Sequence, residues 1–148
     1  MSSLREQAVQ AAVTALNTDT PAGVPQTERA RTLALDAANL PTIIAYAVKD
    51  EAGDVGGRKG PIVARKLRLH FECWAVETEE LSADAAVDPL ICWVVKALTD
   101  STLGGLLNGL REAETTLVLD REDRAVCYAT VVMVADYQCK SGDLEQRH

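Results

Sequence analysis

Apolar and polar side chains alternate most regularly through residues 64–77. The two alternating sets are Leu67, Leu69, Phe71, Cys73 and Ala75 on one side and Lys66, Arg68, His70, Glu72 and Trp74 on the other. A period of two is that of a β-strand. The pattern therefore predicts a strand with one face in the core and one face exposed or at an interface.

Residues 3–16 show helical spacing instead. Ser3 and Glu6 have the spacing of a capping box, and an Ala-rich apolar face follows, which suits close packing on a sheet. A second helix is predicted at residues 88–98, where Asp88 precedes Pro89. An earlier start of this helix, near Ser82 or Asp84, stays open.

Three further segments are predicted to be strands. Residues 41–48 are β-branched and aromatic, and residues 114–120 and 125–138 are joined by a charged turn. The last segment is apolar on both faces, which favours a central place in the sheet.

The remaining segments give weaker patterns. Residues 18–40 are compatible with a short edge strand and a loop, because Pro25 argues against a central strand. Residues 49–61 carry four of the nine glycines and are predicted to form a mobile surface loop.

This order of elements is typical of an α+β fold. We expect a largely antiparallel mixed sheet of about four to five strands, with two main helices packed on one face. The length fits a single domain, residues 1–148, in which residues 140–148 form a flexible tail.

The stretch Thr99–Leu110, "TDSTLGGLLNGL", places two glycines between leucines. One of Gly104 and Gly105 is expected to end the helix, or the turn after it, with a positive φ. The other is expected to let Leu103 and Leu106 fold back onto the sheet without a clashing Cβ.

The net charge and the composition argue against some classes of function. A net charge of −7 with scattered basic residues argues against nucleic-acid binding. No apolar run reaches the roughly 18 residues of a membrane span, and the first residues lack a signal-peptide core, so we expect a soluble, cytoplasmic protein. The four cysteines, widely spaced, are expected to be buried hydrophobic residues: Cys73, Cys92, Cys127 and Cys139.

Catalytic motifs are missing from the sequence. The glycine-rich "GDVGGRKG" lacks the spacing of a phosphate-binding loop, and the acidic clusters lack that of a calcium loop. His70 lies three residues from Cys73, so the two point to opposite faces of one strand. We therefore predict no enzyme activity and no catalytic, cofactor-binding or metal-binding residues.

Five pieces of the chain resemble one family in their order and spacing. They are "LREQAVQAAVTAL", "NLPTIIAYAV" (residues 39–48), "RKLRLHFECWA", "ALTDSTLGGLLNGL" and "AVCYATVVMVADYQ". They resemble the phage tail terminator, or tail completion, proteins, similar to the minor tail protein U of lambda-like siphophages, and the resemblance covers roughly residues 3–139. Residues 18–38 do not align with that pattern.

The resemblance implies a structural role without catalysis. Members of this family form a homohexameric ring that caps the tail tube, stops its polymerisation and presents a surface for joining the head. The implied partners are further copies of the chain, the tail tube protein and a head-completion or connector protein, with no membrane and no nucleic acid. The implied location is the host cytoplasm during assembly and then the virion tail; magnesium-assisted assembly stays open.

Within that role, the candidate tube or subunit contacts are Trp74, Asp54, Arg58 and Lys59. Trp74 stands on the otherwise polar face of its strand, which suits an interface; burial by its own chain is the alternative. The loop at residues 50–60 could order on docking, or could be a plain hairpin loop.

Three other functions stay open at this stage. The chain could be another small head–tail connector, or a toxin–immunity or adaptor module, which its acidic charge fits. It could also be a small cytoplasmic α+β enzyme or ligand-binding protein. That reading needs a pocket that gathers His70, Cys127 or the carboxylates.

Overall fold

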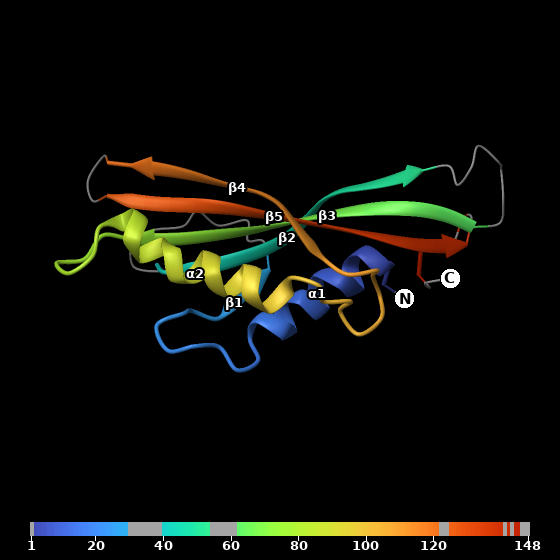
Figure 1. The fold of residues 1–148 in the computed structure, drawn as a ribbon, viewed down its shortest axis with the longest axis horizontal. Coiled ribbons are helices and arrows are strands. Elements are labelled where there is room, and N and C mark those ends of the chain that lie inside the picture. The colour runs from blue at the N-terminus through green and yellow to red at the C-terminus, as the bar shows by residue number, and fades with distance from the viewer. Residues whose placement is uncertain are drawn as a thin grey trace.

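The computed structural model describes residues 2–29, 40–53, 62–121, 125–140, 142 and 144–145. The elements in chain order are α1 (Leu4–Leu16), β1 (Thr27–Arg29), β2 (Thr42–Gly53), β3 (Ile62–Val76), α2 (Ala83–Leu98), β4 (Arg111–Asp120) and β5 (Val126–Lys140). Figure 1 shows both helices on the same side of one extended sheet.

The sheet has five strands in the order β1-β2-β3-β5-β4. β1 is parallel to β2, and every other neighbouring pair is antiparallel. The predicted α+β class is therefore confirmed. The inner position of β5, between β3 and β4, and the edge position of the short strand β1 agree with the sequence patterns.

The core lies between the helices and the sheet. One apolar face of each helix packs there against apolar side chains of β2, β3 and β5, and Phe71 and Tyr137 are among the largest fully buried side chains. Trp93 of α2 donates its indole Nε1–H to the Leu16 carbonyl at 3.0 Å, which ties the two helices together. Neither described helix has the length and apolarity that crossing a bilayer requires.

Half of the predicted capping box is present at the start of α1. The Glu6 backbone N–H donates to the Ser3 hydroxyl at 3.2 Å. The Glu6 carboxylate instead accepts from Arg29 of β1, with Nη2 to Oε2 at 2.9 Å. This ion pair joins the first turn of α1 to the edge strand. The Leu4 N–H also donates to the Leu144 carbonyl, so residues at the two ends of the chain lie side by side.

The predicted start of the surface loop, at residue 49, is wrong. Residues 49–53 continue β2, and the β2–β3 ladder runs to the pair Gly53 and Ala64 after a register shift between Ala47 and Lys49. Polar side chains on a strand that extends past the helices have the composition of a loop, and this explains the wrong boundary. Residues 54–61 lie outside the described residues.

Two other boundaries also differ from the first expectation. α2 begins at Ala83 with Ser82 as its N-cap, so Pro89 lies inside the helix and the earlier start is the correct one. β4 begins at Arg111, because residues 111–113 extend the ladder with β5 through a register shift between Glu112 and Glu114.

A buried ionic contact links β2, β3 and β5 at the edge of the core. The Asp50 carboxylate, 4% exposed, accepts from Arg65 Nε at 2.9 Å and from the Tyr137 hydroxyl at 2.7 Å. Arg5 of α1 approaches the same carboxylate at 3.7 Å. Burial and the hydrogen bond to Asp50 raise the pKa of Tyr137, so the phenol stays protonated well above neutral pH.

The loop at residues 99–110 is packed onto the sheet. The Asp100 N–H donates to the Leu110 carbonyl at 2.8 Å, and the Leu110 N–H donates to Ser101 at 2.9 Å, which closes the loop at its base. Leu103, Leu107 and Leu110 are buried, whereas Leu106 is half-buried.

The positive φ expected in the turn after the helix is confirmed, whereas the close approach expected for the other glycine is not found. α2 ends at Leu98, so neither glycine ends the helix, and a Cβ on either would meet nothing within 4 Å. Gly104 and Gly105 have φ values of 73° and 89°. The requirement is therefore the left-handed backbone of a tight loop and not a close approach to the sheet.

Replacing Gly104 or Gly105 with valine should lower the free energy of unfolding by about 1–2 kcal/mol each, since a left-handed residue with a Cβ is strained. Urea denaturation followed by circular dichroism measures this. Gly53→Val is the control, because Gly53 has no positive φ and its added Cβ would meet only the Ala64 carbonyl, at 3.6 Å. Equal stability of all three variants would refute the argument.

Candidate functional site

The sheet face opposite the helices, called the open face below, carries a group of aromatic rings. This aromatic cluster consists of Tyr46, His70, Trp74 and Tyr128. Trp74 of β3 is the register partner of Tyr128 of β5, and their rings stack with centroids 4.4 Å apart at an angle of 20°. Tyr46 of β2 lies opposite His70, with centroids 5.6 Å apart. Strand register therefore builds two ring pairs on one face.

Glu72 links the two ring pairs. It precedes Trp74 by two positions on the same face, and its Oε1 accepts the Trp74 indole N–H at 3.2 Å. Burial, with a hydrogen bond to Glu72, raises the pKa of Tyr46. Burial and the nearby Arg68 charge lower the pKa of His70, which favours its neutral form at physiological pH. The cluster thus presents rings with one carboxylate among them.

The open face also has its own apolar layer. Ile44, Val132 and Val134 are the register partners of Glu72, His70 and Arg68, and all three are at most 9% exposed. None of them belongs to the core beneath the helices. A sheet with apolar residues on both faces needs cover on both faces, and on the open face the ring side chains supply part of that cover.

The structure locates only some of the predicted contact residues. Trp74 is half-buried on the open face, where it stacks on a ring of its own chain, and its role as a tube or subunit contact stays a prediction. Asp54, Arg58 and Lys59 lie outside the described residues. Gly104 and Gly105 belong to the loop on the other side of the sheet, away from the aromatic cluster.

The cysteines follow the expected pattern with one exception. Cys73 is fully buried on the helix side, whereas His70 lies on the open face, so the two residues are separated as predicted. Burial raises the pKa of Cys73 to about 12, which disfavours a thiolate. Cys92 is exposed and not buried as expected, because its position on α2 faces away from the core.

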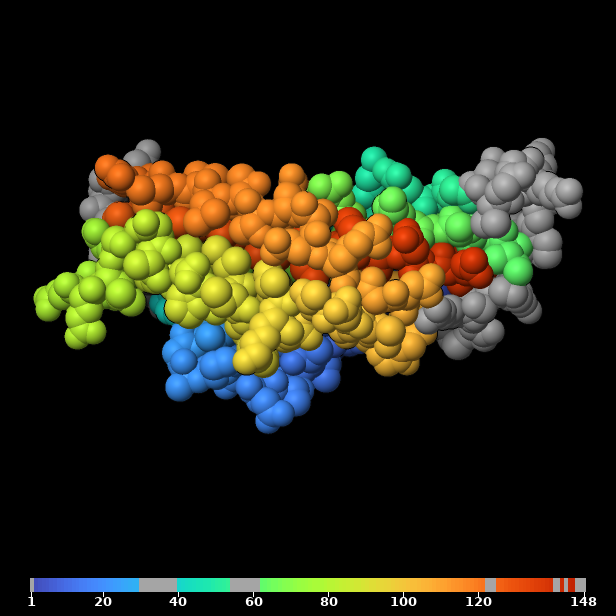
Figure 2. Space-filling model, viewed as in Figure 1, coloured from blue at the N-terminus to red at the C-terminus, as the bar shows by residue number. Residues whose placement is uncertain are grey.

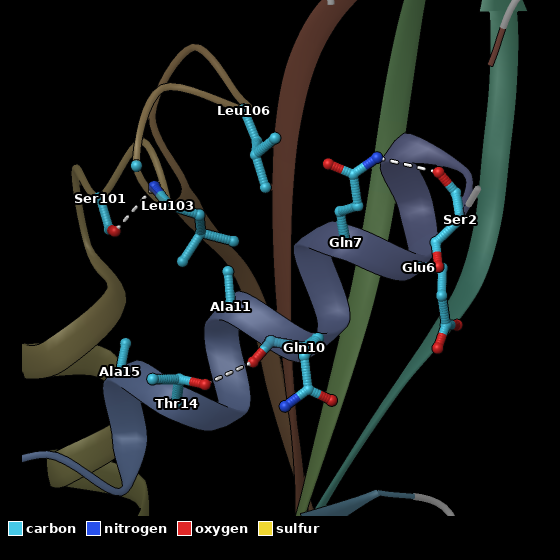
Figure 3. Close-up of a pocket in the computed structure, with 11 residues that line it drawn as sticks. Ser2, Glu6, Gln7, Gln10, Ala11, Thr14, Ala15, Ser101, Leu103 and Leu106 are labelled. Carbon is cyan, nitrogen blue, oxygen red and sulfur yellow. Dashed lines mark hydrogen bonds between the residues drawn. The ribbon is translucent and has the colours of Figure 1, made fainter. Parts of the chain in front are cut away.

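A groove of about 700 Å³ lies between α1 and the loop at residues 101–106. Figure 3 shows Leu103 and Leu106 extending from the loop toward Ala11 of α1. Its lining contains neither histidine nor cysteine. Its one carboxylate, that of Glu6, is already paired with Arg29. It does not gather the residues that the enzyme alternative requires.

The described acidic residues do not converge on a common point. Among the described residues, no group of three histidine, cysteine, aspartate or glutamate side chains could hold a metal ion. The predicted acidic groups therefore give no metal geometry within the part of the chain that the structure describes.

The chain matches no protein-family model, and its comparison with curated proteins gives no significant match. The candidate function therefore depends on the geometry above and on the resemblance in the sequence.

The stacking of Trp74 on Tyr128 could not be read from the sequence. The alternating pattern indicates that Trp74 is on the polar face of its strand, and Tyr128 lies in a strand that is apolar on both faces. Only the register of β3 with β5 shows that the two rings are opposite each other.

Proposed function

We propose that this protein is a structural subunit of a phage tail terminator: a ring of identical chains that caps the tail tube, stops tube growth and offers a surface to the head. The observation that carries the proposal is the aromatic cluster on the open face, a surface with the composition of a protein contact. Tryptophan and tyrosine are enriched in interfaces, where their rings supply contact area at low entropic cost.

The arrangement of layers supports a contact on this face. Both helices lie on the other side of the sheet, so neither covers the rings (Figure 1). Trp74 and Tyr128 are held by stacking, and Glu72 fixes the indole N–H. A surface ordered in this way before binding loses less side-chain freedom on binding.

The proposed partners are further copies of the chain in a hexameric ring, the tail tube protein, and a head-completion or connector protein. Asp54, Arg58 and Lys59, in the segment between β2 and β3, are additional proposed contacts. The proposed location is the host cytoplasm during assembly and then the virion tail. The proposed function involves no catalysis and no cofactor. Magnesium is included in the experiment below because it is a candidate aid to assembly.

The decisive experiment measures tube capping. Tail-tube protein is polymerised alone and with the purified chain, and tube lengths are measured by electron microscopy. Native mass spectrometry of the free chain, with and without magnesium, gives the stoichiometry. We expect shorter tubes with a ring at one end, and loss of both effects in Trp74→Ala.

Leu81→Ala is the matched control, because Leu81 is a 48% exposed apolar residue in the turn before α2. It should cap tubes as the wild type does. Thermal melts of both variants show whether each is folded. A folded wild-type chain that forms no ring with or without tubes, and leaves tube length unchanged, overturns the proposal.

A further inference from the structure

β4 is an end strand of the sheet and is exposed along its whole length. It pairs with β5 on one side, and no described strand pairs with its other side. Nine of its ten residues are exposed, and Thr115 is half-buried. Figure 1 shows β4 along one long edge of the sheet, and Figure 2 shows its residues, in orange, at the surface there.

Three consecutive large apolar residues lie on this edge. Leu117, Val118 and Leu119 are 52%, 40% and 40% exposed. Side chains alternate between the faces of a strand, so Leu117 and Leu119 lie on the helix side and Val118 lies on the open face. An exposed edge that is apolar on both faces is a template for pairing with another strand.

The features that usually block such pairing lie at the two ends of β4, mainly in its first four residues, with Asp120 alone at the other end. Charged side chains and bulges protect natural sheet edges. Arg111, Glu112 and Glu114, with the register shift between the two glutamates, occupy the first four residues. The half from Thr115 to Leu119 has no charged residue, no proline and no register shift. The unprotected half is therefore the apolar half.

We propose that β4 binds β4 of a second copy of this chain, antiparallel, about a two-fold axis at Val118. Such an axis is perpendicular to the sheet, so the open faces of the two copies join into one surface, and so do their helix sides. The residue at the axis then lies opposite the same residue of the second copy. In this register Val118 faces Val118, and Leu117 faces Leu119. Thr116 then lies opposite Asp120, and Thr115 lies opposite Arg121.

Charge disfavours the two registers whose axis lies nearer the start of β4. An axis at Thr116 would place Glu112 opposite Asp120, and an axis at Leu117 would place Glu114 opposite Asp120. Like charges directly opposite each other on paired strands are destabilising. The axis at Val118 avoids both pairs and joins the apolar residues to one another.

The surface beside Leu119 has room for the second copy. A hollow of about 390 Å³ adjoins it, lined by Ala83 at the start of α2, by Ala125 and by polar residues of the neighbouring turns. Leu117 of the second copy would lie next to Leu119 at this hollow. The contact would therefore bury apolar surface on the helix side as well as on the open face.

This inference does not rest on the proposed function. A two-fold contact closes on itself and adds no third copy, so it is separate from the head-to-tail contacts of a ring. It describes the free protein, in which the second copy covers the edge that would otherwise pair with unrelated strands.

The first test is the mass in solution, by sedimentation equilibrium over a wide concentration range. We expect a monomer–dimer equilibrium for the wild type. Val118→Lys places two ammonium groups at the axis and should weaken dimerisation by at least about tenfold. Val48→Lys is the matched control, because Val48 is a 50% exposed valine on β2, and it should dimerise as the wild type does.

A second test checks the register. In a Cys92→Ser background, which removes the exposed thiol, Val118→Cys should form a disulfide-linked dimer on mild oxidation much faster than Thr116→Cys. A wild type that stays monomeric, a Val118→Lys variant that dimerises normally, or faster cross-linking of Thr116→Cys would each overturn the proposal. Tube capping by Val118→Lys is measured separately, so failure of the dimer and failure of the terminator function are distinguishable.

Discussion

Replacing Asp50 with alanine should lower the free energy of unfolding by about 3 kcal/mol, because the substitution leaves a largely buried guanidinium without its counter-ion. The Asp50 carboxylate accepts from Arg65 Nε at 2.9 Å and from the Tyr137 hydroxyl at 2.7 Å. The side chains of Asp50 and Arg65 are 4% and 17% exposed, so water cannot fully replace the lost contact. Urea denaturation followed by circular dichroism measures the change.

Asp136→Ala is the matched control for this prediction. Asp136 also pairs with an arginine, Arg111 at 3.5 Å, but both side chains are about half exposed. Exposed pairs of this kind contribute at most about 1 kcal/mol. The isosteric Asp50→Asn should fall between the two alanine variants, since the amide oxygen still accepts a hydrogen bond. Equal losses of unfolding free energy in Asp50→Ala and Asp136→Ala would show that burial of the ion pair does not add to its contribution to stability.

Replacing Leu107 with alanine should cost about 2–5 kcal/mol, the range for a leucine truncated in a packed core. Leu107 belongs to the loop between α2 and β4, yet its side chain is fully buried. Its N–H also donates to the Thr102 carbonyl at 3.0 Å, so the loop holds the side chain in place. The measurement is the shift in the urea midpoint at unchanged slope.

The neighbouring leucine is the control, since Leu106 lies in the same loop and is only half-buried, at the groove between the loop and α1. Leu106→Ala removes the same atoms and should cost clearly less. If the two variants lose equal stability, the loop does not pack onto the sheet as described.

The elements that were predicted correctly are those whose pattern follows directly from burial. β3 alternates because one face contacts the helices and the other does not, and the structure confirms that alternation from Leu67 to Ala75. β5 lacks alternation from Val131 to Ala135 because both of its faces are buried there, and it lies inside the sheet. The local pattern of apolar and polar residues is therefore sufficient to predict such strands.

The errors arise where local composition and tertiary position disagree. Residues 49–53 are polar because β2 extends past the helices, and polar strand residues resemble a loop. The contact of Asp50 with Arg65 and Tyr137 depends on the registers of β2 with β3 and of β3 with β5, which no local pattern contains. The cluster around Trp74 was missed in part for the same reason. Its tryptophan was identified, and its ring partner was not.

The position of the β3–β5 ladder determines how the chain can fold. Residues 62–76 pair with residues 126–140, and α2, the loop at residues 99–110 and β4 all lie between them in the sequence. The middle of the sheet therefore has high contact order, and closing it costs chain entropy before its hydrogen bonds form. α2 packs on both strands of the ladder, so it can bring them together. We expect the hairpins β2–β3 and β4–β5 to form early and their docking through α2 to be the slow step.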